Sequence, residues 1–400
     1  MEPVKEVISN LKLRASYGFT GNTEIGVYES LATLGTSNWI LGNQLVSGFF
    51  PNKIPNPDLK WERTGQFDIG LDLGLFNNRL RITTDYYKKK TTDLLYSVAV
   101  PATSGYQTML KNIGSIENQG YELSIESDNL TGAFSWTTAF NIAFNRNKVL
   151  ELGGEEYKEM AEGDGHLKTG SVRRLIVGEP IGVFYGYRFD GIFQNEEECK
   201  QQTSSASPIG VGLRRYKDLN GDGKVDAAND REILGDANPK FFGGLTNTFA
   251  YKGFELNVFL QYSYGNKILN YNAMELENPT GGQNAYADMV NRWTPENPSN
   301  IYPKATTNRA LLVSDRFIED GSYLKLKTLS LSYSFPKINL KHIQGLRLYV
   351  TGQNLLTWTK YRGYDPEVSY RGASTLEAGE DFGGYPQSRT FMFGIKIDIK

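Results

Sequence analysis

Residues 66–87 constrain the fold of this chain more than any other stretch, because apolar and polar side chains alternate strictly through them. Phe67, Ile69 and Leu71 begin one face, and the residues between them are polar or glycine. After a polar turn at residues 76–79, the alternation resumes with the two-residue period of a β-strand. The stretch therefore predicts a β-hairpin with one apolar face. Its register is well specified, because a slip of one residue would exchange the two faces.

Two architectures accommodate such a hairpin. In a soluble sandwich the apolar face packs on a second sheet, whereas in an outer-membrane barrel it faces lipid and the polar face lines the lumen. The composition is compatible with both, since 24 Tyr and 42 Gly among 400 residues suit a turn-rich β protein. No segment approaches the run of about 20 apolar residues that a membrane-spanning helix needs.

Charge and reactive residues exclude several other classes of function. The net charge of −2 argues against nucleic acid as a partner, because a surface that binds nucleic acid is strongly basic. The single cysteine, Cys199, cannot form an internal disulfide. His166 and His342 show no metal-ligand spacing, and no serine lies in a nucleophile-elbow pattern. We therefore expect a protein that is not an enzyme.

Alternation like that of residues 66–87 recurs along the chain. It predicts further strands at residues 11–17, 112–127, 134–149, 242–250, 254–262, 323–335, 346–358 and 389–399. A pair at residues 172–177 and 181–193, joined by Gly178, Glu179 and Pro180, is expected in the same sheet. The total is about twelve to fourteen strands, within the range of outer-membrane barrels.

The connections between these strands favour a barrel over a sandwich. After the first strand, short and long connections alternate without exception. The short links lie near residues 77, 130, 179 and 252 and at 336–344, and the long ones at 19–60, 96–111, 150–168, 194–240, 265–321 and 359–388. Antiparallel strands reverse direction, so all long loops fall at one end. This asymmetry is typical of an all-β, antiparallel transmembrane β-barrel with short periplasmic turns and long extracellular loops.

A loop at residues 218–230 resembles a calcium-binding loop. Oxygen donors stand at positions 1, 3, 5 and 9, a glycine at position 6 allows a sharp turn, and position 7 contributes a backbone carbonyl. Position 12, where an acidic bidentate ligand is usual, is Asn229. The acidic ligand would have to be Asp230, the next residue, and the loop would have to bulge by one residue to bring it to the ion. The expected ligands of a structural calcium ion are Asp218, Asn220, Asp222, Lys224, Asp226 and Asp230. The alternative is a polar turn that binds no ion.

Aromatic residues in the long loops are the candidate ligand contacts, since their rings can stack on apolar faces of sugars or peptides. The candidates are Trp293, Tyr302, Tyr361, Tyr364 and Tyr385. The alternative for each is a place in the membrane-interface girdle or in the packing of its own loop.

Several stretches together resemble the SusC/RagA family of TonB-dependent outer-membrane transporters. They are NPDLKWE at 56–62, NIGSIENQGYEL at 112–123, VGEPIG at 177–182 with YGY at 185–187, the loop at 218–226, RWTPENP at 292–298, SDRFIEDGSYLKLK at 314–327, GYDPE at 363–367 and YPQSRT at 385–390. These stretches cover nearly the whole chain in order.

The resemblance implies that residues 1–400 are the carboxy-terminal part of a 22-stranded barrel in the outer membrane of a Gram-negative bacterium. It also implies import of oligosaccharides or peptides, with a SusD-type surface lipoprotein that delivers substrate and a TonB complex that acts on an amino-terminal plug. This chain shows no signal peptide, TonB box or plug. We therefore expect an open, curved sheet with two unpaired edges. The alternatives are a passive porin-like barrel and a soluble, calcium-stabilised carbohydrate-binding β protein.

Overall fold

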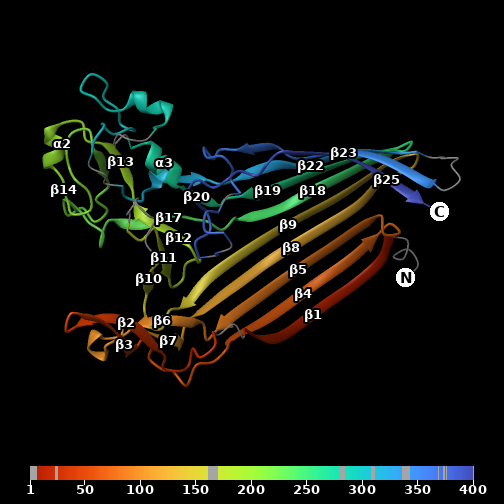
Figure 1. The fold of residues 1–400 in the computed structure, drawn as a ribbon. Coiled ribbons are helices and arrows are strands. Elements are labelled where there is room, and N and C mark those ends of the chain that lie inside the picture. Colours follow the sequence, from red (N-terminus) through yellow and green to blue (C-terminus); the bar gives the residue numbers. More distant parts are fainter. Residues whose placement is uncertain are drawn as a thin grey trace.

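The computed structural model describes residues 7–22, 26–160, 170–278, 284–307, 311–335, 343–367, 369–372, 374 and 376–399. Ten long strands form one curved antiparallel sheet (Figure 1). In sheet order they are β1 (Ile8–Asn22), β4 (Glu62–Leu75), β5 (Leu80–Thr92), β8 (Ser115–Thr131), β9 (Phe134–Glu151), β18 (Phe241–Tyr251), β19 (Phe254–Tyr264), β22 (Tyr323–Ser334), β23 (Ile343–Thr359) and β25 (Thr390–Ile399). The sheet is open, because β1 and β25 each pair with one neighbour among the described residues.

The register of the sheet confirms the expected separation of apolar and polar faces. Leu13 pairs with Leu71, and Ile69 pairs with Tyr86, so apolar side chains line up across neighbouring strands. This face is open: Leu13 is 72% exposed and Phe393 is 83% exposed. A soluble sandwich would bury these side chains against a second sheet. Their exposure therefore argues against a sandwich. A lipid-facing wall explains the exposure.

Tight turns close the short ends of the hairpins. In the β18–β19 turn, Lys252 and Gly253 both have positive φ, 46° and 86°, as the favoured two-residue hairpin turn requires. In the β4–β5 turn, Phe76, Asn77 and Asn78 adopt left-handed φ of 53°, 59° and 61°. Asparagine tolerates this region because its side chain can hydrogen-bond locally, which accounts for the Asn pair at this turn.

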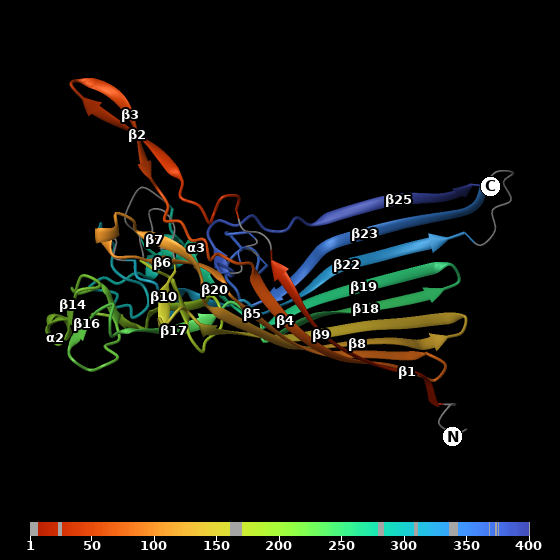
Figure 2. The same cartoon turned by 90° about the horizontal axis from the view of Figure 1, so that it is seen from below.

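Long and short connections alternate along the whole sheet, as the sequence predicts. The short ones join β4–β5, β8–β9, β18–β19 and β22–β23. Residues 336–342 of the last of these, which include His342, lie outside the described residues, as does His166. The long loops gather at one end as a cap, while β1 begins and β25 ends at the opposite end (Figures 1 and 2).

One predicted strand pair does not belong to the sheet. Residues 172–177 and 181–193 do contain β11 (Arg173–Ile176) and β12 (Val183–Tyr187), and these pair antiparallel. They lie in a separate four-stranded sheet of the cap, in the order β10 (Tyr157–Glu159), β11, β12, β17 (Arg231–Asp236). The expected twelve to fourteen strands are therefore ten within the described residues. Residues 152–240 form a single long connection.

The buried core of the chain lies in the cap and not in the wall. Ten buried residues from two long loops pack together there: Val172, Phe184, Leu234, Leu269, Tyr271, Ala273, Met274, Leu311, Val313 and Phe317. Beside them lies a three-stranded sheet of β21 (Ile318–Asp320), β20 (Lys267–Asn270) and β24 (Glu380–Asp381), with α3 (Tyr271–Leu276). Burial of apolar area against partners from other loops gives the cap its own stability.

The remaining elements are short. They are the hairpins β2 (Leu34–Leu41) with β3 (Gln44–Pro51) and β6 (Leu95–Ala99) with β7 (Thr108–Asn112), and the pairs β13 (Phe189–Ile192) with β15 (Arg214–Tyr216) and β14 (Thr203–Ser204) with β16 (Lys224–Val225). The helices are α2 (Glu196–Lys200), η1 (Ala102–Ser104), η3 (Ala287–Asn291) and η4 (Asp315–Phe317). In the described part of the chain, every helix is too short or too polar to cross a membrane.

Candidate functional site at the mouth of the sheet

The loop between β23 and β25, residues 360–389, is anchored to the polar face of the sheet through Lys325. Lys325 lies in β22, is 1% exposed and pairs in register with Gln261 of β19. Its ammonium lies 2.6 Å from Asp365 Oδ1 and 2.5 Å from Glu367 Oε2. A long loop is thereby tied to the wall at the end of the sheet where the loops gather.

Both carboxylates of this anchor accept further hydrogen bonds. The Lys327 ammonium lies 3.0 Å from Glu367 Oε2, and the Tyr323 hydroxyl donates to Glu367 Oε1 at 3.2 Å. The second oxygen of Asp365 accepts the backbone N–H of Gln387 at 3.1 Å. Asp365 therefore joins the two halves of the loop to each other as well as to Lys325.

The anchor keeps its carboxylates ionised. Burial raises the pKa of Asp365, but the hydrogen bond from Lys325 and two backbone N–H groups outweigh burial and hold that pKa below its usual value. The pKa of Glu367 is likewise lowered, since the hydrogen bonds from Lys325 and Lys327 outweigh the effect of burial. The paired form of the loop is thus the charged form.

A second group of ion pairs joins the same loop to the cap. Glu277 is buried and contacts Arg316 at 2.9 Å and Arg362 at 2.8 Å. Arg362 also contacts Glu319 at 2.8 Å. Although burial lowers the pKa of Arg362, its hydrogen bonds to the two carboxylates raise it overall. Arg173 of the cap contacts Glu380 at 2.8 Å with both side chains buried, so loop 360–389 is fixed at several points.

The five predicted aromatic contacts differ in exposure: three rings are buried or half-buried in loop packing, and two are exposed. Tyr361 is buried, and its hydroxyl donates to Asp381 at 2.5 Å; burial and this bond raise its pKa. Trp293 is half-buried and donates from Nε1 to Gln194 at 3.0 Å. The structure therefore gives Tyr361 a contact within its own loop and Trp293 a contact that joins two loops of the cap.

Tyr302 is the third ring in loop packing, because it is half-buried, donates to Asp288 at 3.2 Å and lies under the Arg316 guanidinium. The other two candidates are open: Tyr364 is 80% exposed and Tyr385 is 91% exposed. Tyr364 directly precedes Asp365, and Tyr385 lies two residues before Gln387, which donates to Asp365. Two exposed rings are thus held by one buried anchor.

The predicted calcium loop is closed by its own backbone. Asp218 accepts hydrogen bonds from Gly221 and Gly223 at 2.7 Å each. Asp230 is fully buried, and its two oxygens accept from Leu219 and Asp226, also at 2.7 Å. Within the described residues, no three His, Cys, Asp or Glu side chains converge as metal ligands. Asp230 does fold back onto the start of the loop, as the predicted bulge requires.

The other four predicted ligands also bond within the loop. Asp222 accepts from the Asn220 side-chain amide at 2.9 Å and from the backbone N–H of Lys224 at 2.8 Å. The Lys224 ammonium lies 3.1 Å from Asp226. Backbone N–H groups and this ammonium lower the pKa of Asp226, so its carboxylate is ionised, as a calcium ligand must be.

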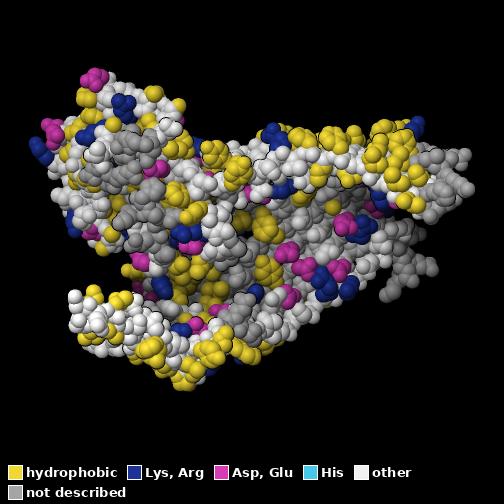
Figure 3. All heavy atoms as spheres, viewed as in Figure 1, with side chains coloured by type: hydrophobic (Ala, Val, Ile, Leu, Met, Phe, Trp, Pro, Cys, Tyr) yellow, Lys and Arg dark blue, Asp and Glu magenta, His cyan; other side chains and the backbone are white. Residues whose placement is uncertain are grey.

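The polar face of the wall carries paired charges. Arg14 contacts Asp72 at 3.0 Å and Asp85 at 2.8 Å across three neighbouring strands. Arg81 contacts Glu126 at 2.9 Å. Figure 3 shows acidic and basic side chains gathered over the strands in the lower half of the view. Such a surface suits a water-filled passage better than contact with lipid.

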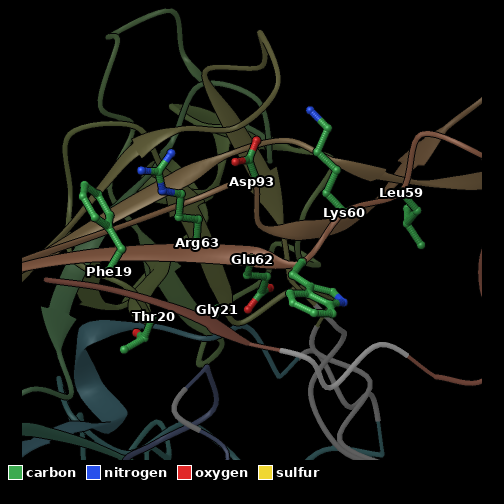
Figure 4. Close-up of a pocket in the computed structure, with 9 residues that line it drawn as sticks. Phe19, Thr20, Gly21, Leu59, Lys60, Glu62, Arg63 and Asp93 are labelled. Carbon is green, nitrogen blue, oxygen red and sulfur yellow. The ribbon is translucent and has the colours of Figure 1, made fainter.

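Several clefts lie near the ends of the strands. One, of about 720 Å³, is shown in Figure 4 between the ends of β1 and β4 and the loops beside them, lined by Phe19, Thr20, Gly21, Leu59, Lys60, Trp61, Glu62, Arg63 and Asp93. Its lining includes the end of the edge strand β1 and the beginning of its partner β4. Another, of about 410 Å³, is mainly apolar and lies between the cap and the rim, with Tyr96, Ile116, Val149 and Lys158 in its lining.

Comparison with known proteins identifies the family to which this wall and cap belong. The family model described as "TonB dependent receptor-like, beta-barrel" matches residues 6–355. The chain belongs to the TonB-dependent receptor family. TonB-dependent receptor P3 of Formosa agariphila is 41% identical over 397 residues, which are 98% of this chain and 39% of that protein.

Two further proteins connect the chain with the SusC/RagA type. TonB-dependent receptor SusC of Bacteroides thetaiotaomicron is 30% identical, over 98% of this chain and 38% of its own length. A solved structure of the RagAB peptide transporter superposes with a TM-score of 0.79 at 27% identity, covering 98% of this chain and 41% of the other. The resemblance seen in the sequence is confirmed. The chain spans about two fifths of the length of the relatives it matches.

The anchor of this TonB-dependent receptor barrel was missed among the sequence-based candidates. Lys325 lies in the stretch 314–327, and Asp365 and Glu367 lie in the stretch 363–367, both of which carry the family resemblance. Gln387 lies in a third, at 385–390. The sequence did contain a signal for this anchor, namely the three family motifs at 314–327, 363–367 and 385–390. They are far apart in the chain, but their residues meet around Lys325.

Proposed function

We propose that the whole protein is an energised outer-membrane importer of an oligomeric nutrient, an oligosaccharide or a peptide. This chain would supply part of the barrel wall and the outer loops. The observation that carries the proposal is the open apolar face of a ten-stranded sheet whose long loops all lie at one end. Membership of the TonB-dependent receptor family supports import over passive passage.

The anchored loop is the proposed place of substrate contact. Tyr364 and Tyr385 present open rings, while Lys325, Asp365 and Glu367 fix the backbone beside them. A ring that is already ordered loses little conformational entropy when a ligand stacks on it. Sugars and peptides both offer apolar faces to such rings, and the RagAB relative is named as a peptide transporter.

The proposed partners follow from the type of transporter. A SusD-type surface lipoprotein would close over the cap and deliver substrate, and a TonB complex would drive import through a plug. The cap offers a stable platform for such a partner, since it has its own buried core. The loop at residues 218–230 would hold a structural calcium ion that draws its carboxylates together. Outer-membrane lipid would cover the apolar face.

Uptake by living cells tests the proposal. Cells that express the whole protein should concentrate labelled oligosaccharide or peptide in the periplasm above its external concentration. Removal of TonB, or collapse of the proton-motive force, should abolish this accumulation. Equilibration that continues unchanged without TonB would indicate a passive porin-like barrel instead. A protein that is recovered in buffer without detergent would contradict both barrel functions.

A further inference from the structure

Basic side chains gather on the membrane-facing side of the sheet, just beyond its apolar rows. Two rows of residues in register cross β5, β8 and β9 there: Lys88, Gln119 and Arg146 in one, and Lys90, Glu117 and Lys148 in the other. Four of these six positions are cationic and one is acidic. All four cationic side chains are exposed.

The register places these cations on the lipid side and not in the lumen. Lys88 pairs with Phe67, which in turn pairs with Tyr17, and both rings are exposed on the apolar face. Between the two lysines, Lys89 pairs with Gln66 on the polar face. Because side chains alternate along a strand, Lys88 and Lys90 share the face of the apolar rows.

An aromatic row lies directly beneath the cations. Tyr86, Tyr121 and Phe144 pair across three strands. The row continues to Phe241, whose ring centroid lies 5.9 Å from that of Phe144, and to Tyr264, 5.0 Å further on. Aromatic girdles mark the levels where a barrel wall leaves the hydrocarbon, so this row marks the edge of the apolar band on the cap side.

The length of β9 supports this placement. Phe134 and Phe144 are ten residues apart on the same face, which corresponds to about 34 Å along the strand. At a tilt of about 40° the vertical height is about 26 Å, close to the apolar band of about 25 Å in outer-membrane barrels. Arg146 and Lys148 follow at the next two positions of that face, at the level of lipid headgroups.

We propose that Lys88, Lys90, Arg146 and Lys148 form a binding site for the phosphate groups of an outer-leaflet glycolipid. Phosphate oxygens accept hydrogen bonds from ammonium and guanidinium groups, and arginine can bind them bidentately. The acyl chains of the same lipid would lie on the apolar rows below, which continue directly into the site. Glu117 contacts Lys88 at 3.1 Å and holds the two rows together at their centre.

The two neighbouring strands on the β1 side support a local site over a uniform belt. On β4 the outward residues opposite Lys88 and Lys90 are Phe67 and Gly65, and on β1 the corresponding residues are Tyr17 and Phe19. The cations of these two rows therefore lie on β5 and β9. A phosphorylated lipid bound there would fix the orientation of the wall beneath the cap.

Lipid retention by the purified full-length protein tests the site. The delipidated protein is incubated with vesicles of phosphatidylethanolamine that contain either diphosphoryl lipid A or its dephosphorylated form, and bound lipid is measured by mass spectrometry. The variant with Lys88→Gln, Lys90→Gln, Arg146→Gln and Lys148→Gln should retain at least about tenfold less of the phosphorylated lipid. High salt should weaken retention by the unmodified protein.

A matched control comes from the polar face of the same region. The pair Lys88→Gln with Lys90→Gln is compared with Lys12→Gln with Lys89→Gln, which lie on the lumen side of β1 and β5. The control should retain lipid normally, and a heat-dependent shift in gel mobility shows that each variant is folded. Equal retention by the fourfold variant, or equal binding of the dephosphorylated lipid, would refute the site. No transport substrate is present, so the outcome is independent of the import proposal.

Discussion

The Lys325 ammonium in strand β22 lies 2.6 Å from Asp365 Oδ1, although Asp365 is 40 residues later in the chain, in the long loop that follows β23. Both side chains are buried. The contact fixes the loop to the wall at Asp365, and the preceding residue, Tyr364, is exposed. The loop that presents open rings is thus tied directly to a strand of the wall.

Replacement of Asp365 by alanine should free this loop. The substitution removes one of the two carboxylates that contact the buried Lys325 ammonium, and the loss of such a charged hydrogen bond costs about 1.5–3 kcal/mol. Hydrogen exchange of residues 360–389 in the full-length protein should rise strongly. Asp398→Ala is the control, since Asp398 forms a pair with Lys396 that is exposed and 3.8 Å long. Unchanged hydrogen exchange in Asp365→Ala would show that the other ion pairs of the loop are enough to hold it against the wall and the cap.

Acid should loosen the same loop. The folded pKa values of Asp365 and Glu367 are below their usual range. Their contribution to stability is therefore complete above pH about 4.5 and is lost as pH falls through the folded values. Limited proteolysis of the loop should increase in that window. In Lys325→Met the carboxyl groups lose the partner that lowers their pKa values. Proteolysis of the loop should therefore begin at a higher pH than in the unmodified protein. An identical onset in both proteins would contradict this account.

Substrate capture should depend on the two open rings. Tyr364→Ala and Tyr385→Ala each remove an exposed ring from the anchored loop, and loss of stacking of about 1 kcal/mol would weaken binding by about fivefold. Tyr251→Ala removes an exposed tyrosine from the opposite end of the sheet and should leave binding unchanged. Titration of the purified protein with labelled oligosaccharide or peptide measures both. If neither loop variant binds more weakly than the control, substrate contact lies elsewhere.

The strands of the wall were predictable because their information is local. In residues 66–87 the alternation of apolar and polar residues predicts the face of the sheet on which each side chain lies. Asn77 and Asn78 predict a turn, because asparagine tolerates the left-handed backbone conformation. The error at β11 and β12 has an equally local cause. Val183 and Phe184 are consecutive residues and both are buried, so this strand has no polar face. A continuous apolar run is typical of a strand covered on both sides, and it distinguishes a cap strand from a lipid-facing one.

The candidate site was less predictable, because its contacts join residues that are distant in sequence. Tyr361 and Tyr364 are both loop tyrosines, and nothing in their immediate neighbours distinguishes them. The buried Asp381, twenty residues later, takes the hydroxyl of Tyr361 and leaves Tyr364 open. Lys325 occupies a polar-face position like any other in its strand until the loop folds back to supply carboxylates. Such pairings depend on the tertiary arrangement and not on a local pattern.

Calcium binding should distinguish a metal loop from a polar turn. If residues 218–230 bind an ion, isothermal titration of the full-length protein should show a high-affinity step that Asp222→Ala removes. Asp190→Ala is the control, because Asp190 lies in the same connection and pairs with Arg215 outside the loop. The hydrogen bonds that the loop carboxylates accept from the backbone also stabilise an ion-free turn. A titration that is unchanged in Asp222→Ala would therefore favour the polar turn.

Insertion of a charge into the apolar face should distinguish the two faces of one strand. Ile125 of β8 lies in the row with Ile82 and Phe140, near the middle of the apolar band. Ile125→Arg should destabilise the folded full-length protein in lipid vesicles by about 2–4 kcal/mol, as expected for arginine near the bilayer midplane. Ser124→Arg, one residue earlier, points to the lumen and should cost far less. Refolding yield into vesicles, followed by the heat-dependent gel shift, compares the two variants. Equal losses for Ile125→Arg and Ser124→Arg would show that both faces of β8 meet the same environment, which is incompatible with a wall between lipid and a polar passage.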